Sequence, residues 1–348
     1  MRCALIEYNT YHEEVLPTFV RLLNALDIRP DVYMVRNSRG RVPFALTTGL
    51  RLRRRRVERM DEHWGLRFRL RRYDLLIINS MEPASIPERL ARTRTPILGV
   101  VHNTELLTDD AAYREFFSSK RRRPLVLWRH IAEQLARDGR AIGWIAHVYF
   151  GEPEPVRADG PTTFAVSGNV EFHRRNYAAL LTAATELVAD DAPFRVRIVG
   201  RSSSKDGQEL RQQVEARGLA GVFEFSPGEI THPDFYRLIA GSDFSLPLID
   251  RSDERLRPYF ESKLASSIPF SIGLGTPLVA HRDLAAAYGV ESCAVLYEDG
   301  GLAAAMRQAI SSSSQSRATL RSEVNATRDE LLAASLENLR LAISSIRG

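Results

Sequence analysis

Cysteine is almost absent from this chain of 348 residues, which contains only Cys3 and Cys293. Two cysteines cannot form a disulfide framework or a zinc site with several cysteine ligands. Low cysteine use is typical of proteins that fold in a reducing compartment. We therefore expect a cytoplasmic protein without a disulfide scaffold.

Long apolar runs are missing as well. No segment approaches the roughly 18 consecutive apolar residues that a membrane-spanning helix needs. The first residues, MRCALIEY, lead directly into a strand-like segment and show none of the regions of a secretory signal peptide. We expect neither a transmembrane helix nor a signal peptide.

Lysine is scarce, although the chain is basic. The sequence has 48 lysines and arginines and a net charge of +5, but the only lysines are Lys120, Lys205 and Lys263. A general preference for arginine can reflect genome composition, so the total says little about function. The distribution says more, because thirteen arginines and only three acidic residues lie between Arg36 and Arg72. A second basic cluster covers Lys120–Arg123.

The usual short motifs of several enzyme classes do not occur. The chain contains no G-x-G-x-x-G after a strand and no G-x-x-x-x-G-K-[ST], which argues against dinucleotide redox enzymes and P-loop proteins. It also lacks H-E-x-x-H, paired C-x-x-C and G-x-S-x-G. What is left are loops at strand ends, where backbone N–H groups and one or two cations can hold a phosphate.

Strand-like apolar runs alternate with amphipathic segments along two halves of the chain. A chain that is 44% hydrophobic and 26% charged can bury a large core, and its length suits two domains. A polar segment rich in proline and glycine, 151–161, separates the halves and is typical of a linker. This pattern predicts two doubly wound α/β domains that face each other across a cleft, over 1–155 and 160–315, followed by a helical tail over 316–348. The strands that we expect are 2–8, 31–35, 74–79, 96–102, 142–150, 162–167, 194–199, 222–225, 244–247, 277–280 and 294–297. The helices that we expect are 12–26, 85–93, 175–190, 209–217, 233–240, 262–274 and 318–346.

The best phosphate-binding candidate follows the strand 162–167. The chain turns at Gly168 and Asn169, carries His173 and two arginines, and enters a helix near Arg175. A phosphate placed here would meet the positive end of a helix and a guanidinium together. The alternative is an ordinary strand-to-helix turn with solvated arginines.

Two further loops could contact a nucleotide. Glu261 could accept hydrogen bonds from sugar or ribose hydroxyls, and Ser266 and Ser267 offer hydroxyls and backbone donors near a helix start. The alternative is that Glu261 pairs with Lys263 on the surface and that the serines cap the helix. The loop 227–233, with Glu229 and Ile230, is a candidate edge for a nucleobase or a plain connection.

The order of these features resembles the nucleotide-sugar-binding half of GT-B glycosyltransferases, and more narrowly their retaining, family 4-like group. That group shows a strand followed by G-R-x(5)-K-N-x(3)-L-L, whose arginine and lysine grip the donor diphosphate. Here Arg175 stands at the lysine position and Asn169 replaces the arginine. The matching residues are Gly168, Asn176, Leu180 and Leu181, then Val199-Gly200 with Arg201 beside it, Ser242-Asp243 to Pro247, and Gly275-Thr276-Pro277-Leu278-Val279.

The resemblance is incomplete in an acidic motif and extends more weakly into the first half. The two glutamate positions of the group's E-x(7)-E motif fall on Ser262 and Phe270, although Glu261 lies next to the first. The segment 99–103 resembles the group's element that places a histidine beside the donor sugar, which implies this role for His102. In the first loop the glycines of the group are missing, and Asn9, His12 and Glu13 are expected to face the acceptor.

The resemblance implies a hexosyltransferase that needs no metal and no cofactor besides its substrate, a nucleotide-diphosphate sugar. It implies retention at the anomeric carbon and a glycan, lipid-linked or small-molecule acceptor. Arg175 and Lys263 would neutralise the leaving diphosphate, which is the main electrostatic demand on such a site. His102 would line the sugar pocket and Glu261 would hold hydroxyls. The degraded acidic motif and Asn169 favour the alternative, a non-catalytic GT-B-like protein that binds a nucleotide or glycan or acts as a scaffold.

Apolar and aromatic residues are interleaved with the arginines between Arg51 and Arg72, and the alternation of apolar with basic residues in Leu66–Arg72 predicts a strand or an interfacial segment. Such a segment on the acceptor side suits an anionic membrane surface, to which each basic residue contributes about 1 kcal/mol. We therefore expect a cytoplasmic protein that can bind the inner face of the membrane. A solvated basic face is the alternative, and nucleic-acid binding is disfavoured because no recognition motif accompanies the charge.

Overall fold

The computed structural model describes residues 1–9, 12–35, 46–58, 70–82, 85–137, 139, 142–155, 160–228 and 230–347. The chain divides into two compact units. Unit 1 comprises Met1–Gly151, Glu261–Leu264 and the segment that begins at Leu331, and unit 2 comprises Glu152–Phe260 and Ala265–Glu330. The short segment Glu261–Leu264 thus belongs to unit 1, although the chain before and after it belongs to unit 2.

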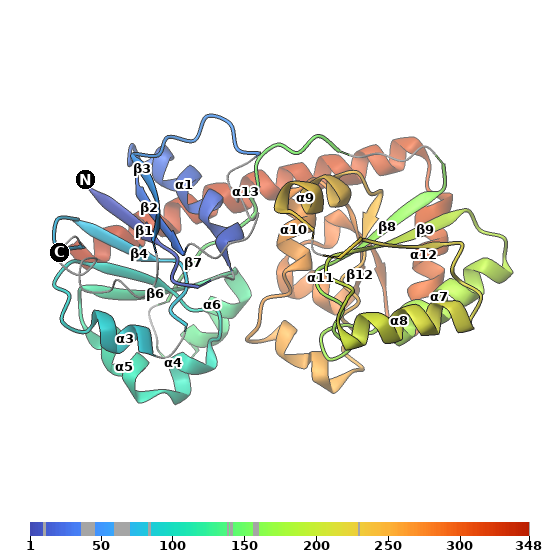
Figure 1. Ribbon diagram of the computed structural model, residues 1–348, viewed down its shortest axis with the longest axis horizontal. Helices are drawn as coiled ribbons and strands as arrows, with labels where there is room; N and C mark the ends of the chain where they lie inside the picture. The colour runs from blue at the N-terminus through green and yellow to red at the C-terminus, as the bar shows by residue number, and fades with distance from the viewer. Residues whose placement is uncertain are drawn as a thin grey trace. The chain divides into compact units, whose positions relative to one another are not determined.

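Unit 1 is built on a parallel sheet, sheet A, whose strand order is β3-β2-β1-β4-β5-β6-β7 over the described residues. Figure 1 shows β3, β2, β1 and β4 in this order. The central strands β1, β4 and β5 are fully buried, as expected for a parallel sheet covered on both faces. The strands are β1 Cys3–Ile6, β2 Asp31–Val35, β3 Arg54–Glu58, β4 Leu75–Ile78, β5 Ile97–Val100, β6 Arg122–Val126 and β7 Gly143–Trp144.

The helices of unit 1 bury apolar stripes against this sheet. In α1, Leu16, Phe19, Val20 and Leu23 are fully buried, and Pro17 occupies the first turn, where it breaks no helical hydrogen bond. Helices α5 and α6 both contact β6. The helical elements are η1 Glu13–Val15, α1 Leu16–Ala25, α3 Ser85–Leu90, α4 Glu105–Asp109, α5 Ala111–Ser118 and α6 Arg129–Ala136.

Unit 2 is built on a second parallel sheet, sheet B, with the strand order β10-β9-β8-β11-β12-β13. Its core joins β8, β9 and β11 to α7 and α12 through fully buried residues such as Phe164, Leu180 and Met306. The strands are β8 Thr162–Ser167, β9 Phe194–Val199, β10 Phe223–Phe225, β11 Phe244–Ser245, β12 Leu278–His281 and β13 Ala294–Tyr297.

Side-chain caps begin the first three helices of unit 2. The side chains of Asn176, Ser204 and Thr231 accept hydrogen bonds from backbone N–H groups in the first turns of α7, α8 and α9. Figure 1 shows the last helix, α13, in red. The helical elements are α7 Tyr177–Ala189, α8 Lys205–Ala216, α9 His232–Ala240, η2 Glu254–Phe260, α10 Ser267–Gly273, α11 Arg282–Tyr288, η3 Glu291–Cys293, α12 Leu302–Ser311 and α13 Ser314–Arg347.

Both sheets contain a point at which the strand order reverses. Successive strands extend sheet A from β1 through β2 to β3, and then in the opposite direction from β4 through β5 to β7. Sheet B extends from β8 to β10 and then from β11 to β13. Right-handed crossovers place the connecting helices of the two directions on opposite faces, which opens a crevice at the carboxyl ends of the strands that flank the reversal. The expected ligand sites are therefore the ends of β1 and β4 in sheet A and of β8 and β11 in sheet B.

The predicted strand 142–150 is wrong in extent, because only Gly143–Trp144 forms β7. The residues that follow are buried, but side-chain hydroxyls replace a neighbouring strand as partners of their backbone. Ser335 Oγ accepts from Ala146 N at 2.9 Å, and Thr18 Oγ1 accepts from Tyr149 N at 3.1 Å. Apolar composition alone cannot distinguish this arrangement from a strand.

Two strands, β3 and β6, were not predicted, and α13 begins a few residues earlier than predicted. Both strands contain consecutive arginines, Arg54–Arg56 and Arg122–Arg123, which hide the apolar pattern. The expected strand-like segment 66–72 falls mostly outside the described residues. Among the helices of the described part, none is both long and apolar enough to cross a membrane.

We predict that Ser335→Ala destabilises the protein. Ser335 is fully buried, and the substitution removes the hydroxyl that accepts the hydrogen bond from the backbone N–H of Ala146. An unsatisfied buried donor costs about 1–3 kcal/mol in the free energy of unfolding, which chemical denaturation would measure. The matched control is Ser344→Ala on the exposed face of the same helix, expected to change stability by less than about 0.5 kcal/mol. Equal stability of the two variants would contradict this packing of α13.

Candidate functional site

Polar side chains gather at the strand reversal of sheet A. Glu7 follows β1, Asn79 and Ser80 follow β4, and His102 follows β5, and these strands are neighbours in the sheet. His12 enters from the loop after β1, and Glu82 lies beyond β4. We call the side chains of Glu7, His12, Asn79, Ser80, Glu82 and His102 the histidine cluster.

Glu7 is the buried acid of the histidine cluster, with 2% of its surface exposed. Its carboxyl accepts hydrogen bonds from Asn79 Nδ2, from Ser80 Oγ at 2.9 Å and from the backbone N of Asn9 at 2.6 Å. Burial raises the pKa of Glu7 to about 7, although these hydrogen bonds and the charge of His12 oppose the shift. The carboxyl therefore exchanges its proton near neutral pH.

His102 is held as a neutral ring. Its Nε2 lies 2.8 Å from the carbonyl oxygen of Asn79, and because a carbonyl oxygen only accepts, Nε2 carries the proton. Burial, followed by the charge of His12, lowers the pKa of His102 well below its usual value. In the neutral ring Nδ1 then has a lone pair, and no described residue donates a hydrogen bond to it. His102 can therefore accept a hydrogen bond from a ligand hydroxyl.

His12 stacks on His102, with ring centroids 3.7 Å apart and an angle of 16° between the planes. About a third of its side chain is exposed (34%), so His12 connects the buried cluster to solvent. Burial lowers the pKa of His12, but Glu14, Glu7 and Glu82 outweigh it and leave a net increase. The carboxylates thus favour the protonated form of His12, whereas His102 favours its neutral form.

Hydrogen bonds between side chains and the backbone fix the positions of the two rings. His12 adopts a left-handed conformation with φ of 69°, and its carbonyl oxygen accepts from Asn79 Nδ2 at 2.8 Å. Glu82 Oε1 accepts from the backbone N of His102 at 2.9 Å and of Asn103 at 2.7 Å. The loops after β1, β4 and β5 are thus tied together. The cluster combines one proton-exchanging acid, one ring with a raised pKa and one ring with a lowered pKa, and such perturbed groups are typical of functional sites.

The second candidate site lies at the strand reversal of sheet B, in the loop 168–176, which we call the Gly168 loop. Two glycines allow close approach of the backbone at the ends of β8 and β9. Gly168 has φ of 102° and Gly200 has φ of 149°, and a Cβ at Gly200 would overlap the carbonyl oxygen of Gly168. Any other residue at position 200 would displace the loop.

Arg175 lies beneath this loop. It is buried, with 7% exposed, and its guanidinium donates to the backbone oxygens of Ser167 and, at 3.1 Å, of Asn169. A Cβ at Gly168 would lie 2.8 Å from Arg175 Nη2, so the glycine leaves only backbone over the cation. The positive charge therefore lies directly under Gly168, while two of its hydrogen bonds hold the turn.

A buried polar chain joins the Gly168 loop to the end of β11. Asn176 Oδ1 caps α7 by accepting from Ala179 N, and Asn176 Nδ2 donates to Asp250 Oδ2 at 2.8 Å. Asp250 Oδ1 accepts from Tyr297 OH at 2.7 Å, and the backbone N of Asn176 donates to Leu248 O. The two strand ends that flank the reversal are thereby fixed to each other.

The predicted site residues fall into separate groups. Asn9 and Glu13 lie beside the histidine cluster with His12 and His102, and Gly168, Asn169, Arg175 and Gly200 lie together in unit 2. Arg201 is exposed next to Gly200, and its carbonyl oxygen accepts from Val170 N at 3.2 Å. Ser266 is exposed before α10, Ser267 is buried in its first turn, and Ile230 is half-buried before α9. Glu229 lies outside the described residues.

Glu261 and Lys263 lie in the segment that belongs to unit 1, not in the unit that contains Arg175. Thr104, two residues after His102, donates from Oγ1 to the backbone oxygen of Ser262 at 2.9 Å. This hydrogen bond places the segment beside the loop that carries His102. At the second glutamate position of the resembled motif, Phe270 packs edge-to-face on Phe235, with ring centroids 5.0 Å apart.

Four members of the histidine cluster were not predicted from the sequence: Glu7, Asn79, Ser80 and Glu82. A signal was present, because Glu7 and Asn79 each follow directly after a fully buried strand. What the sequence could not indicate is that β1 and β4 are neighbours at the reversal. Among the described residues there is no group of three or more histidines, cysteines or acids that could hold a metal ion.

No protein-family model matches the sequence, and no curated protein matches it at a significant level. Several solved structures are similar over nearly the whole chain. HepE from Anabaena in complex with UDP-glucose has a TM-score of 0.62 at 16% identity, covering 99% of this chain and 100% of that chain. A glycosyltransferase from Rickettsia africae has a TM-score of 0.60 at 10% identity, covering 99% and 98%.

A third similar structure is an α,α-trehalose-phosphate synthase (UDP-forming) from Burkholderia vietnamiensis, with a TM-score of 0.58 at 12% identity, covering 99% of both chains. At these identities the likeness concerns the fold. It confirms the predicted class, a GT-B type chain of two Rossmann-like α/β domains.

We predict that Glu7 makes stability depend on pH. Burial raises the pKa of Glu7 from 4.5 to about 7, so between these values the folded protein keeps a proton that the unfolded chain releases. This contribution to stability is complete below pH 4.5 and is lost as the pH rises through 7, a loss of about 3 kcal/mol. Chemical denaturation of Glu7→Gln across this pH range should show a smaller decrease in the free energy of unfolding than in the parent protein.

The matched control for this pH series is Glu88→Gln on the exposed face of α3, which should keep the pH dependence of the parent protein. If Glu7→Gln and the parent lose the same free energy of unfolding between pH 4.5 and pH 8, Glu7 does not hold the proton.

Proposed function

We propose that this protein is a glycosyltransferase that moves a hexosyl group from a nucleotide-diphosphate sugar to an acceptor. The observation that carries the proposal is the coincidence of polar sites with the strand reversals of both units in a GT-B type chain. Similar folds have been solved with UDP and with UDP-glucose bound. Uridine diphosphate sugars are therefore the first donors to test.

In this proposal unit 2 binds the nucleotide-sugar donor at the Gly168 loop. The absence of a side chain at Gly168 lets a diphosphate approach the backbone, and the buried charge of Arg175 beneath it attracts the anion. Removing a diphosphate from water costs free energy, and a fixed cation that faces the diphosphate offsets part of this cost. Gly200, Arg201, Ser266 and Ser267 complete the diphosphate contacts, and Glu229 and Ile230 border the base.

Unit 1 takes the acceptor and contributes to the sugar site. The neutral ring of His102 accepts a hydrogen bond from a sugar hydroxyl through Nδ1, and the cationic ring of His12 stabilises negative charge on the departing phosphate or on the acceptor oxygen. Asn9 and Glu13 border the acceptor. Glu261 holds hydroxyls and Lys263 balances the diphosphate charge, from a segment hydrogen-bonded to the loop after His102.

The finer features of the reaction are supported by the sequence resemblance. We propose retention at the anomeric carbon, no requirement for a metal, and a glycan, lipid-linked or small-molecule acceptor. Basic residues of the Arg51–Arg72 segment, three of which lie consecutively in the edge strand β3, suit an anionic membrane surface at the inner face of the cytoplasmic membrane. Nucleic acid is not a proposed partner.

The proposal predicts stabilisation by nucleotides followed by turnover. Thermal unfolding with UDP, GDP, ADP and their glucose conjugates should identify one nucleotide that raises Tm, since a ligand at 100 times its Kd adds about 2.7 kcal/mol to stability. Arg175→Ala should lower kcat/KM for that donor by about 10²–10³, because a fixed charge at a developing anion is lost. The matched control is Arg174→Ala, whose side chain is exposed and pairs with Glu171 at 2.8 Å, and it should retain activity.

Because Arg175 also holds the turn, Tm without ligand must be compared for Arg175→Ala and for Arg175→Lys, which keeps the charge. Near-parent activity of Arg175→Ala would remove Arg175 from the donor site. Product analysis by NMR, with and without EDTA, tests anomeric retention and the metal requirement.

A non-catalytic nucleotide-binding protein is the second candidate. It is favoured by Phe270, which packs against Phe235 where the resembled group has a glutamate. Nucleotide stabilisation without transfer or donor hydrolysis across a broad acceptor panel would support it. No response to any nucleotide would contradict both candidates.

A further inference from the structure

Unit 1 contains a cavity of about 400 Å³ that the proposed reaction does not use. Its walls come from α5, the turn after that helix and β6, and Ile142 closes one side. The volume lies in the range of small-molecule sites, about 300–1,000 Å³. We call this cavity the α5 pocket.

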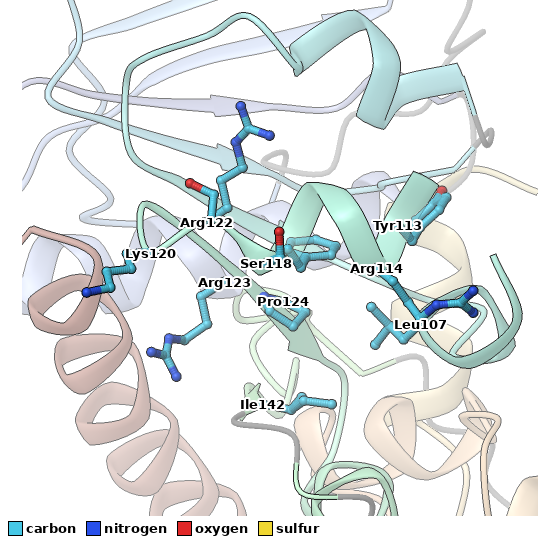
Figure 2. A pocket seen from close by; sticks show the side chains of 11 residues that line it. Leu107, Tyr113, Arg114, Ser118, Lys120, Arg122, Arg123, Pro124 and Ile142 are labelled. Atoms are coloured by element: carbon cyan, nitrogen blue, oxygen red, sulfur yellow. The ribbon is translucent and has the colours of Figure 1, made fainter. Parts of the chain in front are cut away.

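The wall of the α5 pocket is strongly basic. Arg114, Lys120, Arg122 and Arg123 line it, and none of its other lining residues is acidic. Figure 2 shows Lys120 and Arg123 on one side of Pro124 and Arg114 on the other, whereas the guanidinium of Arg122 points away from the other labelled side chains. Three cations thus surround the same apolar centre.

The hydrogen bonds of these cations fix two side chains without cancelling charge. Arg114 Nη1 donates to the backbone oxygen of Thr108 at 2.5 Å, and Arg122 Nη2 donates to that of Ala91 at 2.5 Å. The guanidinium of Arg122 also lies 4.3 Å from the ring centroid of Phe116. Within the described part of the chain, Arg114, Lys120 and Arg122 form no ion pair with a carboxylate. No described carboxylate therefore neutralises the charges of Arg114, Lys120 and Arg122 at the pocket.

Between the cations the pocket is apolar. Leu107, Phe117, Pro124 and Ile142 line it together with the ring of Tyr113. The hydroxyl of Tyr113 donates to the backbone oxygen of Met81 at 2.7 Å and is turned away from the cavity. A small, strongly hydrated anion such as inorganic phosphate would leave this apolar surface uncovered, so the lining favours an anion that carries an apolar group.

We propose that the α5 pocket binds a phosphate ester with an apolar substituent. The phosphate lies between Lys120 and Arg123, with charge-assisted hydrogen bonds that are stronger than those between neutral groups, and the substituent packs on Leu107, Pro124 and Ile142. The same chemistry occurs in a phospholipid headgroup region and in soluble phosphorylated metabolites. This site goes beyond the proposed glycosyl transfer and does not depend on it.

A chain of hydrogen bonds connects the pocket wall with the histidine cluster. Tyr113 lines the pocket with its ring and binds Met81 through its hydroxyl, and Met81 precedes Glu82, which holds the backbone of His102 and Asn103. None of the residues that line the pocket belongs to the histidine cluster.

The test measures binding of hexyl phosphate by isothermal titration calorimetry, with hexanol and inorganic phosphate as separate probes. Hexyl phosphate should bind more tightly than either, and its affinity should fall as salt is raised. Lys120→Gln and Arg123→Gln should each raise its Kd about tenfold, since a charged hydrogen bond contributes about that factor. Lys120 is exposed, so its replacement keeps the test valid if Arg123→Gln fails to fold.

The matched control is Arg121→Gln, an exposed neighbour that does not line the pocket and should leave the Kd unchanged. Co-sedimentation with phosphatidic acid vesicles distinguishes a membrane lipid from a soluble phosphate ester. If Lys120→Gln no longer co-sediments with the vesicles, the site binds a membrane lipid. If Lys120→Gln co-sediments as the parent does, the site binds a soluble ester. Equal Kd values for Lys120→Gln and Arg121→Gln, or hexanol binding as tightly as hexyl phosphate, would overturn the proposal.

The nucleotide-induced change in Tm should be the same in Lys120→Gln as in the parent, so failure here is distinguishable from failure of the proposed transferase function.

Discussion

Parallel pairing with right-handed connections constrains every functional feature of this protein. When the order of parallel strands reverses, the connecting helices leave one face for the other, and the carboxyl ends beside the reversal are not covered by a crossover. In sheet A the reversal falls between β1 and β4, and in sheet B between β8 and β11. The buried polar side chains of Glu7, Asn79 and Ser80 follow the strands beside the reversal in sheet A, and the buried Arg175 lies in the loop after β8.

The two sites meet the cost of burying charge in different ways. In unit 1, Glu7 and His102 favour their neutral forms because they are buried, whereas neighbouring carboxylates favour the protonated form of the partly exposed His12. In unit 2 the buried Arg175 donates from Nη1 and Nη2 to backbone carbonyl oxygens. One site is therefore suited to exchange protons near neutral pH, and the other provides a fixed positive field for an anion.

Much of this architecture could be predicted from the sequence. The apolar strands, the alternation with helices and the Gly168 loop follow from local composition, and His102 was placed correctly at a strand end. The strands β3 and β6 could not be predicted, because runs of arginine replace the apolar pattern there and pairing with a neighbouring strand stabilises them.

The other features that could not be predicted depend on contacts between residues far apart in the chain. The stacking of His12 on His102 depends on the pairing of β1, β4 and β5, and no local pattern contains that information. The burial of Arg175 under Gly168 could not be predicted either, because the same sequence is compatible with a solvated arginine. The place of the segment that carries Glu261 and Lys263 was hidden too, because its membership of unit 1 and the hydrogen bond from Thr104 to Ser262 involve residues far apart in the chain.

A crystal structure of the protein with bound UDP tests the central claim, that the strand reversals are the ligand sites, most directly. The account predicts that the diphosphate lies at the carboxyl ends of β8 and β11, within hydrogen-bonding distance of the backbone of Gly168 or Asn169 and above the guanidinium of Arg175. A well-ordered nucleotide bound elsewhere in unit 2, with this loop empty, would contradict it.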